Sequence, residues 1–183
     1  MPEIEKSALV THSAAKMFAL VDGVEQYPQF LPWCKGSTVH YRDTDATIAT
    51  IAIAWRGIEQ AFTTENANFA PNRIELRQPT AASLAKLAER GVALNVEAPL
   101  FTALNGQWQF LPLADNACKV VLKLQYQLAT PLLAAAVGPV FGLIAATLVE
   151  RFVARVDATS AFDTHFETPS QADLNALGGV RPY

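Results

Sequence analysis

Residues 4–11 alternate polar and apolar side chains with a period of two, which is typical of a β-strand. Over residues 14–21 the apolar positions recur at helical spacing instead, and Ser13 stands where an N-cap is expected. A second short helical segment is expected over residues 24–27, ending at Pro28. The first part of the chain therefore predicts one strand followed by two short helices.

A long run of strand signals follows, between residues 36 and 77. It is rich in β-branched and aromatic side chains, and Arg56-Gly57 marks a tight turn inside it. A helix is expected at residues 81–90, because Thr80 can serve as its N-cap and Gly91 fits the C′ position. The strand signals then resume at residues 92–96, 106–110 and 118–128.

The pattern ends with a long apolar helix, predicted from residue 132 to about residue 159. This order of elements predicts an α+β fold, in which an antiparallel sheet has helices on one side. Residues 1–159 are assigned to this single domain. Residues 160–183 are polar and contain Pro169 and Pro182, so they are expected to form a flexible tail.

The last helix raises the question of a membrane span, because residues 124–149 contain no charged side chain. Three features favour the core helix of a soluble domain instead. The run begins as an alternating strand, Thr130-Pro131 interrupts it, and the helix continues into an amphipathic segment at residues 150–156. The first six residues lack an apolar signal core, so a cytoplasmic location is expected, with a peripheral site at the inner membrane as the alternative.

Composition and charge narrow the function classes. Of the 183 residues, 51% are hydrophobic and 17% are charged, which excludes a disordered or low-complexity chain. The net charge of −3 disfavours binding through phosphate neutralisation, and no DNA partner is expected. Cys34 and Cys118 have neither zinc-site spacing nor a disulfide framework, which fits a reduced compartment.

Catalytic signatures are sparse. His12, His40 and His165 lack the spacing of a metal-binding pair, so no metal site is predicted. A Cys34–His40 nucleophile pair is a weak interpretation, since the extended chain between them would span roughly 20 Å. No catalytic residue is predicted, and no cofactor is required.

Small residues gather along the first half of the last helix, namely Ala134, Ala135, Ala136, Gly138, Gly142, Ala145 and Ala146. They indicate either close helix–sheet packing or a cavity for an apolar ligand, since ligand pockets are mostly apolar. Gly138-Pro139 predicts a kink that would widen or gate such a cavity.

Residues 27–34 have the sequence YPQFLPWC. This segment resembles the YPxFLPWC signature of the coenzyme-Q-binding, START-like family, the polyketide cyclase/dehydrase group that includes ribosome-association toxins. Two further landmarks of that family follow in order, FTTEN at residues 62–66 and LNGQWQF at residues 104–110. The resemblance covers residues 2–158.

The resemblance implies a helix-grip fold, in which a curved antiparallel sheet surrounds the C-terminal helix and an apolar tunnel lies between them. It implies that the tunnel binds ubiquinone or a related isoprenoid, supporting respiratory electron transport without catalysis. The loop at residues 30–33 is expected to form the tunnel's entrance and to touch a membrane surface transiently. The expected ligand-binding residues are Phe30, Leu31, Trp33, Trp55, Phe62, Trp108, Phe110, Val140, Phe141, Ile144 and Phe152.

Two other functions remain open within the same family. A toxin-like protein would bind the large ribosomal subunit and block subunit joining, for which a basic patch of Lys6, Lys16, Lys35 and Arg42 is a candidate. A polyketide cyclase or dehydratase would need acid–base residues in the tunnel, and the sequence offers no convincing pair. An insertion around residues 79–91 departs from the family pattern and leaves specificity there open.

Overall fold

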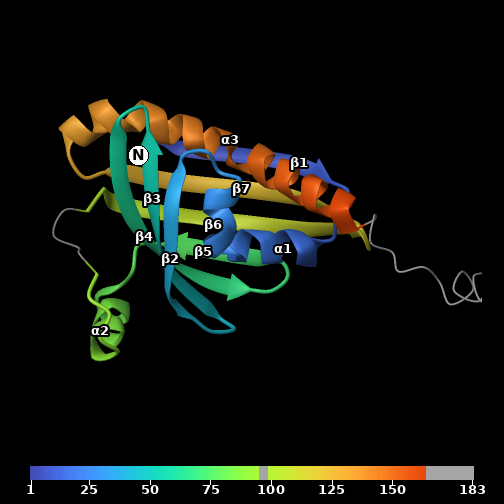
Figure 1. Cartoon of the computed structure of the whole chain (residues 1–183), viewed down its shortest axis with the longest axis horizontal. Coiled ribbons are helices and arrows are strands. Elements are labelled where there is room, and N and C mark those ends of the chain that lie inside the picture. The colour runs from blue at the N-terminus through green and yellow to red at the C-terminus, as the bar shows by residue number, and fades with distance from the viewer. Residues whose placement is uncertain (95–98, 164–183) are drawn as a thin grey trace, which may run out of the picture.

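The computed structural model describes residues 1–94 and 99–163. Their strands form one curved antiparallel sheet of seven strands in the order β1-β7-β6-β5-β4-β3-β2 (Figure 1). The elements are β1 (Glu3–Val10), α1 (Ala14–Asp22), the 3-10 helix η1 (Val24–Gln29), β2 (Cys34–Arg42), β3 (Ala46–Trp55), β4 (Ile58–Phe69), β5 (Arg73–Arg77), α2 (Ala81–Glu89), β6 (Phe101–Ala114), β7 (Ala117–Leu128) and α3 (Pro131–Asp163).

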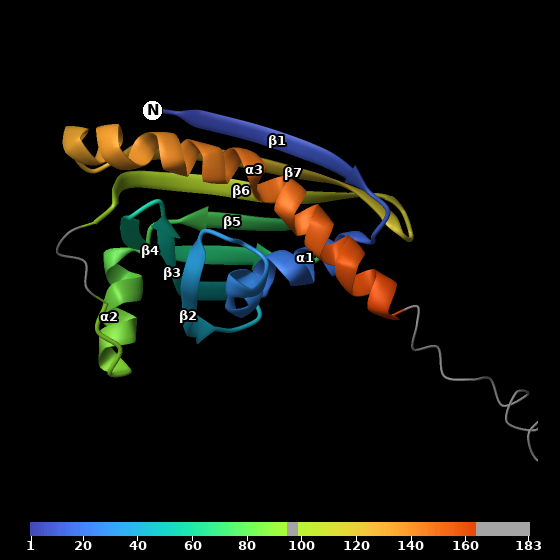
Figure 2. The same ribbon diagram turned by 45° about the horizontal axis from the view of Figure 1, so that its top comes forward.

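The two edge strands, β1 and β2, follow each other in sequence and lie at opposite sides of the sheet. The helices α1 and η1 carry the chain from one edge to the other (Figure 2). As predicted, α1 begins after Ser13, whose hydroxyl accepts a hydrogen bond from the Lys16 amide at 3.2 Å. The second helical segment runs through Pro28 to Gln29, slightly beyond its predicted end.

The turn between β3 and β4 shows how local sequence sets the register. Arg56 and Gly57 both have positive φ angles, 47° and 84°, which is the backbone geometry of a type I′ hairpin turn. The turn pairs Trp55 with Ile58 and continues in register to Ala46 opposite Ala67. The Arg56-Gly57 turn predicted from the sequence is therefore confirmed.

Helix α3 crosses the concave face of the sheet and grips it through one apolar side (Figures 1 and 2). The side chains that it buries in the core are Val137, Phe141, Ile144, Ala145, Val149, Phe152 and Val156. Its segment Pro131–Ala161 is long and apolar enough to cross a membrane, with a mean hydropathy of 2.3, and 28% of the most apolar stretch is buried. The helix is thus part of the domain core, and its other side is apolar over residues 131–149 and carries charged side chains such as Glu150, Arg151 and Asp157 beyond them.

Helix α2 lies apart from the core, near one end of the strands (Figure 2). Thr80 caps it by accepting a hydrogen bond from the Ser83 amide at 3.1 Å. At the other end, Gly91 donates to Ala88 and Val92 donates to Leu87, which together make a Schellman motif.

That motif explains one wrong prediction. Residues 92–94 were expected to start a strand, whereas they close the helix and continue without regular structure. Residues 95–96 of the same predicted strand lie outside the described residues. At the carboxyl end, α3 extends to Asp163, past the predicted domain boundary at residue 159, and the remainder of the predicted tail is also outside the described residues.

Candidate functional site

A cavity of about 80 Å³ lies between α3 and the concave face of the sheet. Residues from α1, η1, the following loop, five strands and α3 enclose it, and most of them are aliphatic or aromatic. They are Val21, Val24, Tyr27, Trp33, Ile51, Phe62, Thr64, Asn66, Leu76, Leu104, Trp108, Leu124, Phe141, Ile144, Ala145, Leu148 and Phe152. The wall is therefore suited to an apolar ligand.

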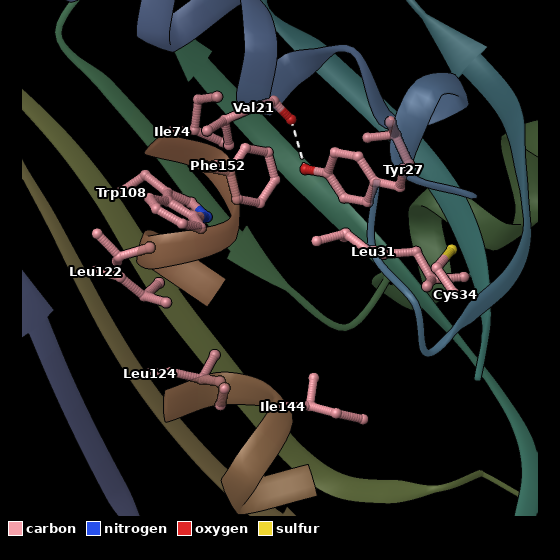
Figure 3. Close-up of a cluster of buried hydrophobic side chains, with 14 of the residues drawn as sticks. Val21, Tyr27, Leu31, Cys34, Ile74, Trp108, Leu122, Leu124, Ile144 and Phe152 are labelled. Atoms are coloured by element: carbon pink, nitrogen blue, oxygen red, sulfur yellow. Dashed lines mark hydrogen bonds between the residues drawn. The ribbon is translucent and has the colours of Figure 1, made fainter. Parts of the chain in front are cut away.

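Two groups of aromatic rings build the walls of the cavity. Around Phe152 the rings of Tyr27, Phe30 and Trp108 lie edge to face, with centroids 5.2 to 5.3 Å away. Figure 3 shows Phe152 between Trp108 and Tyr27, and Ile144 at an earlier turn of the same helix, α3. Edge-to-face pairs of this kind hold rings in fixed positions, so these walls are preorganised.

The second group surrounds Phe141. Its ring centroid lies 4.7 Å from that of Tyr126, 4.9 Å from that of Phe101 and 6.2 Å from that of Phe62. Neither Phe101 nor Tyr126 was expected near a ligand, although alternation in the strand at residues 118–128 puts Tyr126 on the same face as Leu122, Leu124 and Leu128. Phe101 and Tyr126 lie outside the cavity lining and pack against Phe141, which belongs to it.

A glycine makes the sheet side of the cavity possible. A Cβ added at Gly106 would come within 2.9 Å of Leu124 and 3.0 Å of Leu76, two side chains that line the cavity. Any larger residue would force these leucine side chains to shift. This close approach gives the LNGQWQF segment a packing role.

The structure places six of the predicted ligand-binding residues around the cavity, namely Trp33, Phe62, Trp108, Phe141, Ile144 and Phe152. The other five lie outside its lining. Leu31 and Phe110 are fully enclosed core residues, Phe30 and Val140 pack against the core, and Trp55 faces an outer depression. Strand alternation alone put Phe110 beside Trp108, and the rings are indeed stacked 6.4 Å apart, but Phe110 packs beneath Phe18.

In the loop at residues 30–33, Leu31 and Trp33 are buried and Phe30 is half-buried. Leu31 is 1% exposed and Trp33 is 5% exposed, so the loop forms a closed lid over the core. An outer depression of about 180 Å³ lies on the far side of Trp33 and Ile144, which line both spaces. The remaining walls of this depression are Pro32, Trp55, Leu143, Thr147 and Arg151.

The predicted gate at Gly138-Pro139 lies elsewhere. These two residues line a separate depression together with Pro2, Tyr126 and Gln127, and they share no lining residue with the cavity. Helix α3 continues through Pro139. The depression that shares lining residues with the cavity is instead the one bordered by Trp33 and Ile144.

Three polar side chains face the cavity from the sheet and η1. The Tyr27 hydroxyl donates a hydrogen bond of 2.6 Å to the Val21 carbonyl (Figure 3), and burial raises the pKa of this phenol far above its usual value. Thr64 and Asn66 project from alternate positions of β4. None of the described lining residues carries an imidazole, carboxyl, thiol or cationic side chain, so the cavity wall offers no acid–base pair.

The Cys34–His40 pair does not form. The buried Cys34 thiol donates to the Gly36 carbonyl, and burial raises its pKa. The His40 ring instead bonds the Thr50 hydroxyl at 2.7 Å, and burial lowers its pKa. Within the described residues, no cluster of His, Cys, Asp or Glu side chains is arranged to hold a metal ion.

The predicted basic patch is also dispersed. Lys35 and Arg42 lie at opposite ends of β2, which corresponds to a separation of roughly 23 Å. Lys35 pairs with Glu59 at 2.8 Å, and Arg42 pairs with Glu25 at 2.6 Å. Their charges are therefore locally balanced.

Comparison with known proteins places the molecule in context. A sequence model of the family described as polyketide cyclase / dehydrase and lipid transport matches residues 10–153. The chain is 36% identical over 152 residues to the ribosome association toxin RatA of Pseudomonas aeruginosa, covering 83% of this chain and 93% of that protein. It is 23% identical over 154 residues to the mitochondrial coenzyme Q-binding protein COQ10 of Drosophila melanogaster, covering 82% of this chain and 57% of that one.

Solved structures share the fold at low sequence identity. A START superfamily protein from Mycobacterium smegmatis aligns with a TM-score of 0.64 and 18% identity, over 86% of this chain and 98% of that chain. The Zhui aromatase/cyclase from Streptomyces aligns with a TM-score of 0.67 and 11% identity, over 85% and 93%. The architecture is therefore the START-like helix-grip fold.

Proposed function

The chain belongs to the polyketide cyclase/dehydrase and lipid transport family, and from this premise we propose that it binds a quinone-type isoprenoid in the cavity beneath α3 without transforming it. The observation that carries this proposal is the aromatic and aliphatic wall between α3 and the sheet. Burying apolar ligand surface there contributes about 25 cal/mol per Å². The coenzyme Q-binding relative supports the same ligand class.

The volume of the cavity limits how the ligand sits. About 80 Å³ is less than the roughly 150 Å³ of an engineered cavity that accepts benzene. A quinone ring therefore needs the partition at Trp33 and Ile144 to move, which would join the cavity to the outer depression of about 180 Å³. We propose that the ring lies inside and the isoprenoid tail leaves through this opening.

The absence of acid–base groups among the described lining residues supports binding without reaction. Cyclisation or dehydration of a polyketide requires proton transfer by a positioned group. The phenol of Tyr27 is held by Val21, and burial raises its pKa, so this group keeps its proton near neutral pH. The likeness to the Zhui aromatase/cyclase is a likeness of fold, at 11% sequence identity.

Contact with a lipid surface is part of the proposal. Leu132 and Leu143 of α3 are 78% and 53% exposed and lie on one stripe of the helix. Leu143 borders the outer depression together with Trp55 and Arg151. The Arg56 guanidinium lies 5.9 Å from the centroid of the Trp55 ring. Tryptophan and arginine beside an apolar stripe are typical of side chains at a membrane interface, and here they flank the route into the cavity.

The direct experiment is extraction of the native protein and mass spectrometry of the bound lipids. We expect an isoprenoid quinone at a substantial fraction of one per protein, and the same molecule unchanged after incubation. A purified protein that carries no lipid and takes up none from quinone-loaded vesicles would refute the proposal.

Ribosome association is the second candidate, because the relatives that bear this name are 26% to 36% identical to the chain, compared with 23% for the coenzyme Q-binding relative. A sedimentation assay of purified ribosomal subunits tests it. Inhibition of subunit joining by the lipid-free protein would favour this candidate. Comigration with neither subunit would exclude it.

A further inference from the structure

Two buried polar atoms of the cavity wall have no hydrogen-bond partner among the described residues. They are the Nε1 donor of Trp33 and the Oδ1 acceptor of Asn66. Trp33 is 5% exposed and Asn66 is 7% exposed, and both line the cavity. Leaving a buried donor or acceptor unpaired is unfavourable, so such groups are rare unless something else binds them.

The neighbouring polar side chains are partnered to different extents. The Tyr27 hydroxyl is held by Val21 at 2.6 Å. On β4 the Nδ2 of Asn68 donates to Asp22 at 3.1 Å and to Thr47 at 3.3 Å, while its Oδ1 is unpartnered like that of Asn66 but belongs to a residue outside the cavity lining. Among the described residues, the other side chains with a buried polar atom that lacks a hydrogen-bond partner, those of Asn68, Arg73 and Arg155, lie outside the cavity lining, whereas Trp33 and Asn66 belong to it.

The two atoms come from different segments of the cavity wall. Trp33 belongs to the lid loop that follows η1, and Asn66 lies on the inner face of β4, two positions beyond Thr64. A ligand ring between the lid and the sheet would face both. One segment supplies a hydrogen-bond donor and the other supplies an acceptor, so a ligand that pairs with both carries an acceptor and a donor, as a hydroxylated ring does.

We propose that Trp33 and Asn66 form a head-group site for a hydroxylated aromatic ring, so that the protein binds the hydroquinone form of its ligand more tightly than the quinone form. This inference rests on the proposed function. Trp33 Nε1 donates to a ring oxygen in either form, because both forms have lone pairs. Asn66 Oδ1 accepts only from the hydroxyl of the hydroquinone, because the quinone has no proton to give.

The test measures binding of a short-chain ubiquinol analogue and of the corresponding ubiquinone, anaerobically, by quenching of tryptophan emission and by calorimetry. The parent protein should prefer the quinol by about 3- to 10-fold, the range of one neutral hydrogen bond. Asn66→Leu should remove this preference and leave quinone affinity nearly unchanged. Trp33→Phe keeps an aromatic side chain but loses the N–H, and it should weaken the binding of both forms by a similar factor. Because this variant lacks the Trp33 emission, its affinities are measured by calorimetry.

Stability of the lipid-free variants provides a second readout. Because Asn66 Oδ1 has no partner in the fold, Asn66→Leu should unfold at the same temperature as the parent or higher. Gln60→Leu, which removes an amide from the same face of β4 outside the cavity, is the matched control and should leave both affinities unchanged.

The outcomes separate this inference from the proposed function. Equal affinity of the parent for quinol and quinone, or a quinol preference that survives in Asn66→Leu, would overturn the head-group site while leaving quinone binding intact. Failure of the parent to bind either form would overturn both.

Discussion

Trp33 and Ile144 together separate the inner cavity from the outer depression, since each side chain lines both spaces. One belongs to the lid loop and the other to α3, so a shift of either element opens the route between them. The partition therefore couples two features that the sequence places far apart, the YPQFLPWC segment and the apolar helix.

Ile144→Ala should widen this partition. We expect faster association of a short-chain quinone, followed by stopped-flow quenching of tryptophan emission, and a stability loss of about 2–5 kcal/mol from the lost packing. Ile53→Ala is the control, because Ile53 is 2% exposed and lies outside the cavity lining. If both variants associated at the parent's rate, ligand would enter by another route.

Phe152→Ala should destabilise the protein by about 3–5 kcal/mol in urea unfolding. Phe152 is fully buried and holds the rings of Tyr27, Phe30 and Trp108 in place. Phe69→Ala, at an aromatic residue that is 45% exposed, should cost less than about 1 kcal/mol. A similar loss in both variants would show that the rings around Phe152 do not act as a packed unit.

The attachment of α2 should weaken in acid. Burial raises the pKa of Glu65, but hydrogen bonds from Arg77, Ser83 and the Thr80 amide outweigh this effect and hold its pKa below the ordinary value of 4.5. A lowered folded-state pKa contributes stability above pH 4.5, and this contribution disappears as the pH falls through the folded-state value.

The measurement for Glu65 is chemical denaturation of the parent and Glu65→Gln between pH 7 and pH 3. The parent should be the more stable protein at pH 7, and the difference should shrink below about pH 4.5. A difference that stays constant over this range would mean that the charge of Glu65 contributes nothing.

The exposed stripe of α3 should mediate lipid contact. Leu132→Glu combined with Leu143→Glu should reduce binding to liposomes severalfold, because charged side chains do not enter the apolar layer. Leu113→Glu changes a leucine that is 62% exposed on β6 and is the control. Unchanged sedimentation with liposomes in the double variant would rule out this stripe as the contact.

Much of the fold could be predicted because its signals are local. The N-caps Ser13 and Thr80, the Arg56-Gly57 turn and Gly91 at the end of α2 depend on a few neighbouring residues, and all are confirmed. The strand expected at residues 92–96 failed because the same short apolar run also closes a helix through the Val92 amide.

The cavity was harder to predict because its lining depends on where α3 crosses the sheet. Alternation puts Trp108 and Phe110 on one face, and only the course of α1 and α3 decides that Trp108 borders the cavity while Phe110 lies under α1. Asn66 was missed although a signal existed, since it shares the inward face of its strand with Phe62 and Thr64. A polar residue at an inward position is the pattern to look for.

The central claim is that the ligand occupies the space between α3 and the sheet, and Ala145 tests it most directly. Ala145 is fully buried, lines the cavity and lies on the gripping side of α3. Leucine at this position would fill much of an 80 Å³ space. Ala154→Leu, at an exposed position of the same helix, is the matched control.

Calorimetric titration of both variants with a short-chain ubiquinone, with thermal unfolding recorded alongside, gives the decisive result. We expect Ala145→Leu to remain folded and to lose at least about tenfold in affinity, while Ala154→Leu binds as the parent does. A folded Ala145→Leu protein with the parent's affinity would contradict the account, because the ligand would then bind outside the cavity.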